Sequence, residues 1–272
     1  MHIKARGSLD SVPRLLFQRP TWTHNHTRNL NTSKSAIMGS QDAKLILYTN
    51  RGCPWAHRAH IALAEIGVPF EEVTIDLSVP RTPEYLAINP RGLVPALSYN
   101  GEIIIESAIV ANFLANRFPS HLIPTSDSEG GAIQRARIDI FVDAFISKFQ
   151  SPLFKLFAAK TEEETTPIVE SAVAAVVKEI EPLLAGAAPF FGGSDKLTQA
   201  EVLTGSFAIR LLSNTKHGIY PASLLESLKT QAPNFAKWAE VVAAHPSVSA
   251  IYDESVVIPN TKARIAKIRG AA

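Results

Sequence analysis

The chain has 272 residues, with 46% hydrophobic and 19% charged residues, so it can form a packed core of one large domain or two small ones. Its formal net charge of +2 does not indicate a nucleic-acid partner, and no apolar run approaches the roughly 20 residues of a membrane-spanning helix. The one cysteine, Cys53, excludes an intramolecular disulfide framework and a cysteine-rich metal site. The eight histidines show no zinc-type spacing, so we expect no metal and a reducing, cytoplasmic location.

The N-terminal segment differs in composition from the rest of the chain. Residues 1–37 carry several arginines and lysines but one acid, which resembles a mitochondrial presequence. A targeting segment, a disordered tail and an extension upstream of a working start at Met38 all fit this composition. We expect residues 1–40 to be an extension outside the folded domains, with a mitochondrial location if residues 1–37 are a genuine presequence.

The next part of the sequence predicts a small α/β domain over residues 43–121. Pro54 suits a first helical position and Gly67 a helix end, while Asn100-Gly101 is a strong hairpin signal. The resulting order is β-α-β-α-β-β-α. The expected strands are 44–49, 70–75, 96–99 and 102–105, and the expected helices are 54–66, 83–88 and 107–118.

Only helical periodicity follows, so we expect an all-helical domain over residues 128–255 and a basic tail over 256–272. Thr198 and Glu201 have the spacing of a helix capping box. The tail fits either a helix packed near the site or a solvated basic end, and we expect the second. The helical segments are expected at 133–157, 167–184, 199–213, 222–228 and 235–244.

Cys53 is the candidate catalytic residue because it lies where the first strand passes into the first helix. A lone cysteine is commonly a small buried hydrophobe. Free N–H groups and the positive end of the dipole at a helix N-terminus, however, favour an anion such as a thiolate. Arg51 adds a nearby positive charge, and His57 lies one turn on, where we expect it to line the helix surface.

The residue three positions after Cys53 is Ala56, so a dithiol mechanism within this chain is excluded. Thiol–disulfide exchange at Cys53 would then require an external thiol to resolve the mixed disulfide. In a reducing compartment glutathione is the obvious external thiol.

Two further motifs suit a thiol-peptide site. Val94-Pro95 precedes a strand, and a cis bond there would leave the Val94 N–H and C=O free to dock a peptide; an ordinary trans proline fits equally. Ser107 is a natural helix N-cap, and a helix N-terminus binds a carboxylate, while Glu106 beside it can hold an ammonium. A carboxylate and an ammonium on one small group describe the γ-glutamyl end of glutathione.

Three motifs together resemble omega-type, cysteine-type glutathione transferases such as the fungal ones. The motifs are Cys53-Pro-Trp-Ala-His-Arg58, Asn89-Pro-Arg-Gly-Leu-Val-Pro95 and Glu106-Ser-Ala-Ile-Val110, and the resemblance covers about residues 43–255. It implies an α/β plus all-α fold, with an N-terminal thioredoxin-like domain followed by a helical glutathione-transferase C-terminal domain.

The same resemblance implies a homodimeric enzyme that uses glutathione as co-substrate and a small electrophile or disulfide as second substrate. Cys53 takes the catalytic position, and Trp55, Val94, Pro95, Glu106 and Ser107 take glutathione-binding positions. Omega enzymes often carry a lysine for the glycine carboxylate where this chain has Thr82, so we assign that role to the adjacent Arg81.

The expected activity is that of a thiol transferase or reductase, by deglutathionylation or dehydroascorbate-type reduction. One alternative is a conjugating transferase of detoxification or secondary metabolism, in which Tyr48 at the end of the first strand activates glutathione. A glutathionyl-hydroquinone reductase and a non-catalytic interaction module are the others. For the acceptor pocket we expect Phe145, Phe149, Phe154 and Trp238, set between the domains.

Overall fold

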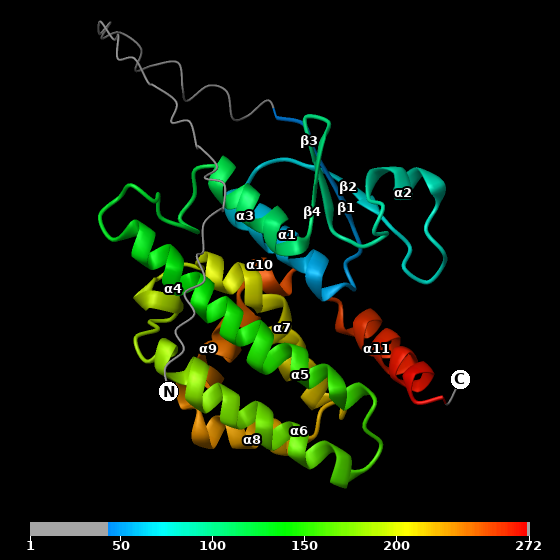
Figure 1. The fold of residues 1–272 in the computed structure, drawn as a ribbon, viewed down its shortest axis with the longest axis vertical. Helices are drawn as coiled ribbons and strands as arrows, with labels where there is room; N and C mark the ends of the chain where they lie inside the picture. Colours follow the sequence, from blue (N-terminus) through cyan, green and yellow to red (C-terminus); the bar gives the residue numbers. More distant parts are fainter. Residues whose placement is uncertain (1–42, 271–272) are drawn as a thin grey trace, which may run out of the picture. The chain divides into compact units, whose positions relative to one another are not determined.

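The computed structural model describes residues 43–270. The N-terminal extension expected over residues 1–40 lies outside the described residues. The first half of the described chain contains a sheet with three helices (Figure 1). Its elements are β1 (Leu45–Thr49), α1 (Pro54–Ile66), β2 (Glu71–Thr74), α2 (Pro83–Ile88), β3 (Ala96–Tyr99), β4 (Glu102–Ile105) and α3 (Ser107–Arg117).

The sheet has strand order β2-β1-β3-β4, with β1 and β2 parallel and the other pairs antiparallel. This confirms the predicted β-α-β-α-β-β-α order and the thioredoxin-like arrangement. The parallel pair requires α1 as its crossover connection, and that crossover places the start of α1 at the carboxyl end of β1.

Local sequence explains where these elements begin and end. Pro54 is the first residue of α1, and Gly67 ends the helix in the left-handed conformation with φ of 72°. Between β3 and β4, Asn100 and Gly101 both have positive φ, at 52° and 93°, as a two-residue hairpin turn requires. Asn100 also accepts a 2.9 Å hydrogen bond from the Lys44 N–H through its side chain.

The second half of the described chain is helical. The predicted segments are found, although two of them contain wider π-helical turns, at Ala144–Gln150 and Val176–Ile180, and end in short 3₁₀ turns at Phe154–Phe157 and Glu181–Leu184. A further 3₁₀ turn, Phe191–Gly193, lies between the predicted segments. The α-helices are α4 (Gly131–Asp143), α5 (Ser151–Leu153), α6 (Glu162–Ala175), α7 (Gln199–Lys216), α8 (Ala222–Gln231), α9 (Pro233–Ala244), α10 (Pro246–Ser249) and α11 (Glu254–Ile268). Within the described residues, none of these helices has the length and apolarity needed to cross a membrane.

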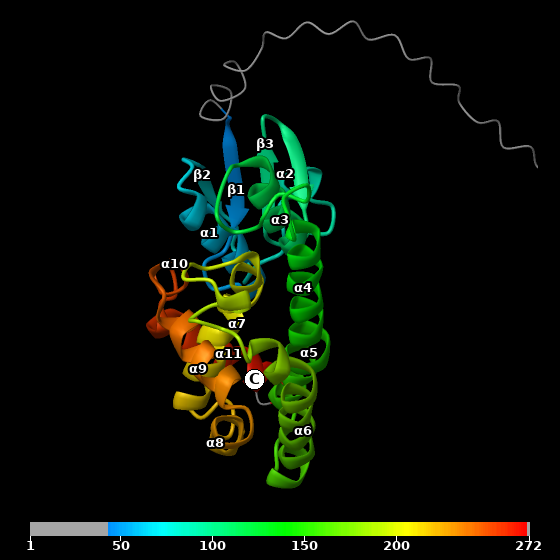
Figure 2. The same ribbon diagram turned by 90° about the vertical axis from the view of Figure 1, so that its left-hand side faces the viewer.

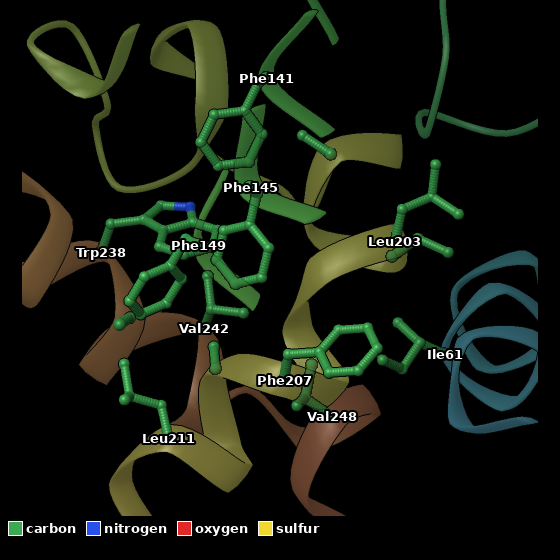
Figure 3. Packing of buried hydrophobic residues seen from close by; sticks show 14 of the residues in the cluster. Ile61, Phe141, Phe145, Phe149, Leu203, Phe207, Leu211, Trp238, Val242 and Val248 are labelled. Carbon is green, nitrogen blue, oxygen red and sulfur yellow. The ribbon is translucent and has the colours of Figure 1, made fainter. Parts of the chain in front are cut away.

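Helix α7 is the central element, because it packs against α9 on one side and against α1 of the sheet half on the other. Figure 3 shows Phe207 of α7 near Ile61 of α1, and the same view places Trp238 among Phe145 and Phe149. The side chains of Phe145, Phe149 and Trp238 are all buried in the main core. Their expected role as an acceptor pocket is therefore wrong: their aromatic spacing reflects core packing, and Phe154 only packs partly buried against the same core.

The basic C-terminal segment is not a solvated end, contrary to expectation. It forms α11 (red in Figure 1), whose Val257, Ile258 and Ile265 are buried, and this helix contacts α7. Arg269 donates hydrogen bonds to the Phe157 carbonyl at 3.0 Å and to the neighbouring Leu156 carbonyl. The apolar residues between the basic ones explain why the segment packs: they form a buried stripe on one helix face.

Candidate active site

Cys53 is the N-cap residue of α1, with extended backbone angles and no hydrogen bond from its side chain. Its own N–H donates to the Asn50 carbonyl at 2.9 Å. Asn50 stiffens the turn, because its side chain accepts from the Gly52 N–H and donates to the Ile75 carbonyl. The half-buried sulfur is thus left at the start of a helix, among N–H groups that have no partner within the helix.

The positive charge of Arg51 is compensated, although this residue lies two positions from Cys53. Its guanidinium makes a two-point ion pair with Glu72 of β2, at 2.9 and 2.8 Å. Its side chain is 61% exposed, so solvent screens what charge remains. Arg51 therefore contributes little to the electrostatics of Cys53.

His57 does not line the helix surface as expected, because it is fully buried between α1 and α7. Its Nδ1 lies 3.1 Å from Nη1 of Arg210. Burial, and secondarily the charge of Arg210, lowers the pKa of His57 to about 3. A guanidinium has only donors, so His57 Nδ1 accepts this hydrogen bond and the ring is neutral.

We predict that the two buried histidines of α1 make the fold sensitive to acid. Burial also lowers the pKa of His60 to about 4, while its Nε2 lies 3.0 Å from the Thr49 hydroxyl. A histidine with a lowered folded pKa stabilises the fold above its unfolded pKa, and this stabilisation is lost as the pH falls below it. Through these two groups the free energy of unfolding should fall by about 4 kcal/mol from pH 7 to pH 5.

Urea unfolding at the two pH values measures this change. The His60→Asn variant, which removes one of the two groups, should show about half of the pH dependence. An equal dependence in the variant and the wild type would contradict the assignment.

Val94 lies beside Cys53, as expected for a peptide-docking residue. The Val94-Pro95 bond is cis, and Val94, Ala56 and Tyr85 form a small buried cluster against which Cys53 packs. The preceding Leu93 carbonyl accepts from the Tyr85 hydroxyl at 2.6 Å and from the side chain of Asn89 at 2.7 Å. Among the described residues no hydrogen bond is formed by the Val94 N–H or C=O, which stay available to a ligand.

Glu106 and Ser107 lie at the start of α3, but their local roles differ from those expected. Glu106 is the N-cap residue, with a positive φ of 70°, and Ser107 is the first residue of the helix. The Ser107 hydroxyl accepts a 3.1 Å hydrogen bond from Arg58 of α1 instead of capping α3. The Glu106 carboxylate pairs with Arg91, and both side chains are exposed.

Trp55 is held in place by contacts from both halves of the described chain. Its ring packs edge-on against Phe207 of α7, with centroids 4.8 Å apart, and the Arg58 guanidinium lies 4.6 Å from its centroid. Arg58 is itself buried and donates to the Leu203 carbonyl of α7 at 2.8 Å. The expected ligand-binding tryptophan is therefore fixed by α7.

Arg81 is used mainly by its own loop. Its Nε donates to the Gly92 carbonyl, and its Nη1 donates to the Asp76 and Val79 carbonyls. Thr82, which stands where omega enzymes often have lysine, caps α2 by accepting from the Tyr85 N–H. Only Nη2 of Arg81 remains for a ligand carboxylate, and that role stays a prediction.

A cavity of about 790 Å³ opens next to the Cys53 turn, and no sequence motif indicated it. Arg51 and Gly52 form one wall, and residues 250–257, which lead into α11, form the other. No group of three or more metal-ligating side chains with suitable geometry occurs within residues 43–270. The site therefore combines a thiol with a free peptide group at Val94, while the cavity is lined by the two residues before Cys53 and not by Cys53 itself.

Comparisons with known proteins agree with this geometry. The glutathione S-transferase N-terminal domain matches residues 43–116. The chain is 28% identical to glutathione transferase omega-1 of Caenorhabditis elegans over 170 residues, which cover 60% of this chain and 64% of that protein. It is 30% identical to a zeta-class glutathione S-transferase of Euphorbia esula over 163 residues, which cover 58% of this chain and 72% of that protein.

The chain belongs to the glutathione transferase family. The structure is also similar to glutathione transferase Omega 1C from Trametes versicolor, with a TM-score of 0.69 and 28% identity over 83% of this chain and 98% of that one. These matches confirm the omega-type resemblance and the two-part fold. The zeta-class relative shows that the shared sequence is not restricted to one class.

Several residues of the site were not identified from the sequence of this glutathione transferase. Arg210 and Tyr252 lie far from Cys53 in sequence. Tyr85 lies in a predicted helix, but its sequence position does not indicate that it packs near Cys53. Arg210 donates to the carbonyl of Gly52 at 3.1 Å. The one available signal for Arg210 was an arginine among the apolar positions of α7, which alone does not indicate a partner.

Proposed function

We propose that this chain is a cysteine-type, glutathione-dependent thiol transferase or reductase with Cys53 as its nucleophile. The observation that carries the proposal is the place of Cys53 as N-cap of α1, with no hydrogen bond from its sulfur. Because helix N-termini favour anions, this position supports the thiolate that attacks disulfides. Similarity to omega-class glutathione transferases supports the glutathione-dependent part of the proposal.

Glutathione, as co-substrate, would lie along the edge formed by the Val94 peptide and the start of α3. The unbonded N–H and C=O of Val94 would pair with its cysteinyl backbone, as an added strand pairs with a sheet edge. Its γ-glutamyl carboxylate would face the N-terminus of α3 at Ser107, and its ammonium would face the Glu106 carboxylate. At the opposite, glycine end of glutathione, Nη2 of Arg81 would bind the carboxylate, and Trp55 would lie nearby.

The reaction consists of two thiol–disulfide exchanges. The Cys53 thiolate attacks the glutathione sulfur of a mixed disulfide, so a Cys53–glutathione disulfide forms and the substrate leaves as a thiolate that takes a proton from water. A second glutathione, as thiolate, then attacks the glutathione sulfur of that disulfide. Cys53 is released as thiolate, and the two glutathione units leave as oxidised glutathione. The incoming glutathione thus supplies the two electrons that reduce the substrate.

Mass spectrometry of the intact protein tests this function. Incubation with a glutathione mixed disulfide should add the mass of one glutathione at Cys53, and free glutathione should remove it. Because the chain has a single cysteine, any disulfide adduct reports on this residue alone. An unmodified protein after incubation, with its fold intact, would reject the proposal.

We also propose that the chain forms a homodimer through β4, α3 and α4. Isoleucines are exposed on these three elements, and Figure 2 shows α3 and α4 following each other along one side. Exposed large apolar residues gathered on neighbouring elements are typical of protein–protein contacts. They are Ile103, Ile109, Ile133 and Ile140.

Light scattering after size exclusion measures the mass in solution. We expect twice the chain mass for the wild type and a monomer for the Ile109→Glu/Ile140→Glu double variant, because a buried charge opposes association. The exposed Val256→Glu variant on α11 is the matched control and should remain dimeric. A monomeric wild type would contradict the proposal that this surface forms a dimer interface.

A further inference from the structure

Arg210 is a buried arginine of α7 that contacts both sides of the Cys53 turn. Its side chain is 8% exposed, and Nη1 is anchored on its own helix by the Ser206 carbonyl at 2.8 Å. The same Nη1 lies 3.1 Å from His57 Nδ1, and Nη2 donates to the Gly52 carbonyl at 3.1 Å. Gly52 directly precedes Cys53, so this guanidinium is bonded to the residue before the nucleophile and to a side chain one turn after it.

No carboxylate neutralises Arg210 within the described part of the chain. Its other close neighbour is the ring of Tyr252, whose centroid lies 5.0 Å from the guanidinium carbon. Hydrogen bonds to carbonyls and a ring face stabilise the cation, but they bring no negative charge. Burial of a guanidinium without a counter-ion is unfavourable, so its environment favours any anion that forms beside it.

The other cations near Cys53 cannot serve as this charge. Arg51 is exposed and neutralised by Glu72, and His57 is neutral. Arg58 points to the Leu203 carbonyl and the Ser107 hydroxyl, on another side of α1. Arg210 is therefore the uncompensated positive charge of the Cys53 turn.

We propose that Arg210 is a positioning residue for the reaction, which holds the Cys53 turn through Gly52 and stabilises the Cys53 thiolate by its positive charge. The proposal rests on the proposed function and adds the helical half of the chain to its chemistry.

The charge of Arg210 is present at neutral pH. Burial lowers the pKa of Arg210 to about 10, which is still well above neutral pH. The guanidinium thus stays protonated across the range in which a thiol titrates. The ionisable groups around Cys53 are Tyr48, Arg51, His57, Tyr85, Arg210 and, behind Arg210, Tyr252.

The pH profile of Cys53 alkylation by iodoacetamide tests the proposal. In Arg210→Gln and Arg210→Met the midpoint pH should rise by about one unit or more, as expected when a nearby opposite charge is removed from the surroundings of a thiolate. Arg210→Lys keeps the charge, so its midpoint should stay near that of the wild type. The control Arg51→Gln, closer in sequence but already neutralised, should leave the midpoint unchanged.

One folded neutral variant is sufficient for the test. Arg210→Met is the more certain to fold, because a methionine side chain fills the buried space and needs no hydrogen-bond partner. An unchanged midpoint in that variant would overturn the proposal, as would the failure of both neutral variants to fold, which would assign Arg210 to the fold alone. The glutathione adduct of the wild type is measured in parallel. An adduct with no midpoint shift rejects the role of Arg210 only, whereas a shift with no adduct rejects the proposed function only.

Discussion

The Cys53→Ser variant is expected to lose the thiol-transfer activity by roughly a thousandfold or more, as nucleophile removal does in enzymes with covalent intermediates. A serine hydroxyl stays protonated at neutral pH and forms no disulfide, so neither exchange step can proceed. The structure gives no reason for a change in fold, because the side chain makes no hydrogen bond and is only half-buried. Steady-state rates with a glutathione mixed disulfide measure the loss.

Tyr48→Phe is the matched control, because it separates the cysteine mechanism from a conjugating one. Tyr48 lies in the same small cluster as Cys53, with its ring 6.0 Å from that of Tyr85. Under our proposal this variant keeps most of the thiol-transfer activity. If Tyr48→Phe is inactive towards a chlorodinitrobenzene-type electrophile and Cys53→Ser is fully active in both assays, the chain is a conjugating transferase instead.

The Glu201→Ala variant is expected to lower the free energy of unfolding by about 3–5 kcal/mol. The Glu201 carboxylate is fully buried and accepts four hydrogen bonds. They come from the N–H groups of Phe191 and Thr198, the Thr198 hydroxyl and Nε1 of Trp238. Alanine would leave all four donors buried without an acceptor.

Burial raises the pKa of Glu201, while these hydrogen bonds oppose that rise. Urea unfolding measures the loss, and Thr198→Ala is the control, since it removes the cap hydroxyl but leaves the carboxylate. That variant should cost about 1 kcal/mol. Equal losses in the two variants would show that Glu201 acts only as a helix cap and not as the acceptor for Trp238 in the core.

Local sequence determined most of the sheet half, because its signals are short-range. Pro54, Gly67 and Asn100-Gly101 each fix a helix or turn boundary by their own backbone preferences, and the structure has those boundaries where they were predicted. The capping box at Thr198 and Glu201 is confirmed for the same reason. Such features depend on a few adjacent residues.

The errors concern packing between distant segments. Phe145, Phe149 and Trp238 were expected in a pocket but are in the core, because helical spacing shows a face and not what covers it. The composition of the last residues suggested a solvated basic end, but the structure buries Val257 and Ile265 of this segment. Arg210 reaches the Cys53 turn from 158 residues away in sequence, a relation that no local pattern contains.

The bonds from α7 to the start of α1 have a consequence for domain exchange. A chimaera that joined residues 43–121 of this chain to the helices of a relative would carry Cys53 and Val94, but not the guanidinium that holds Gly52. It would also lack the Leu203 carbonyl that orients Arg58 and the Phe207 ring that supports Trp55. An active chimaera with this nucleophile therefore has to include α7 of this chain together with residues 43–121.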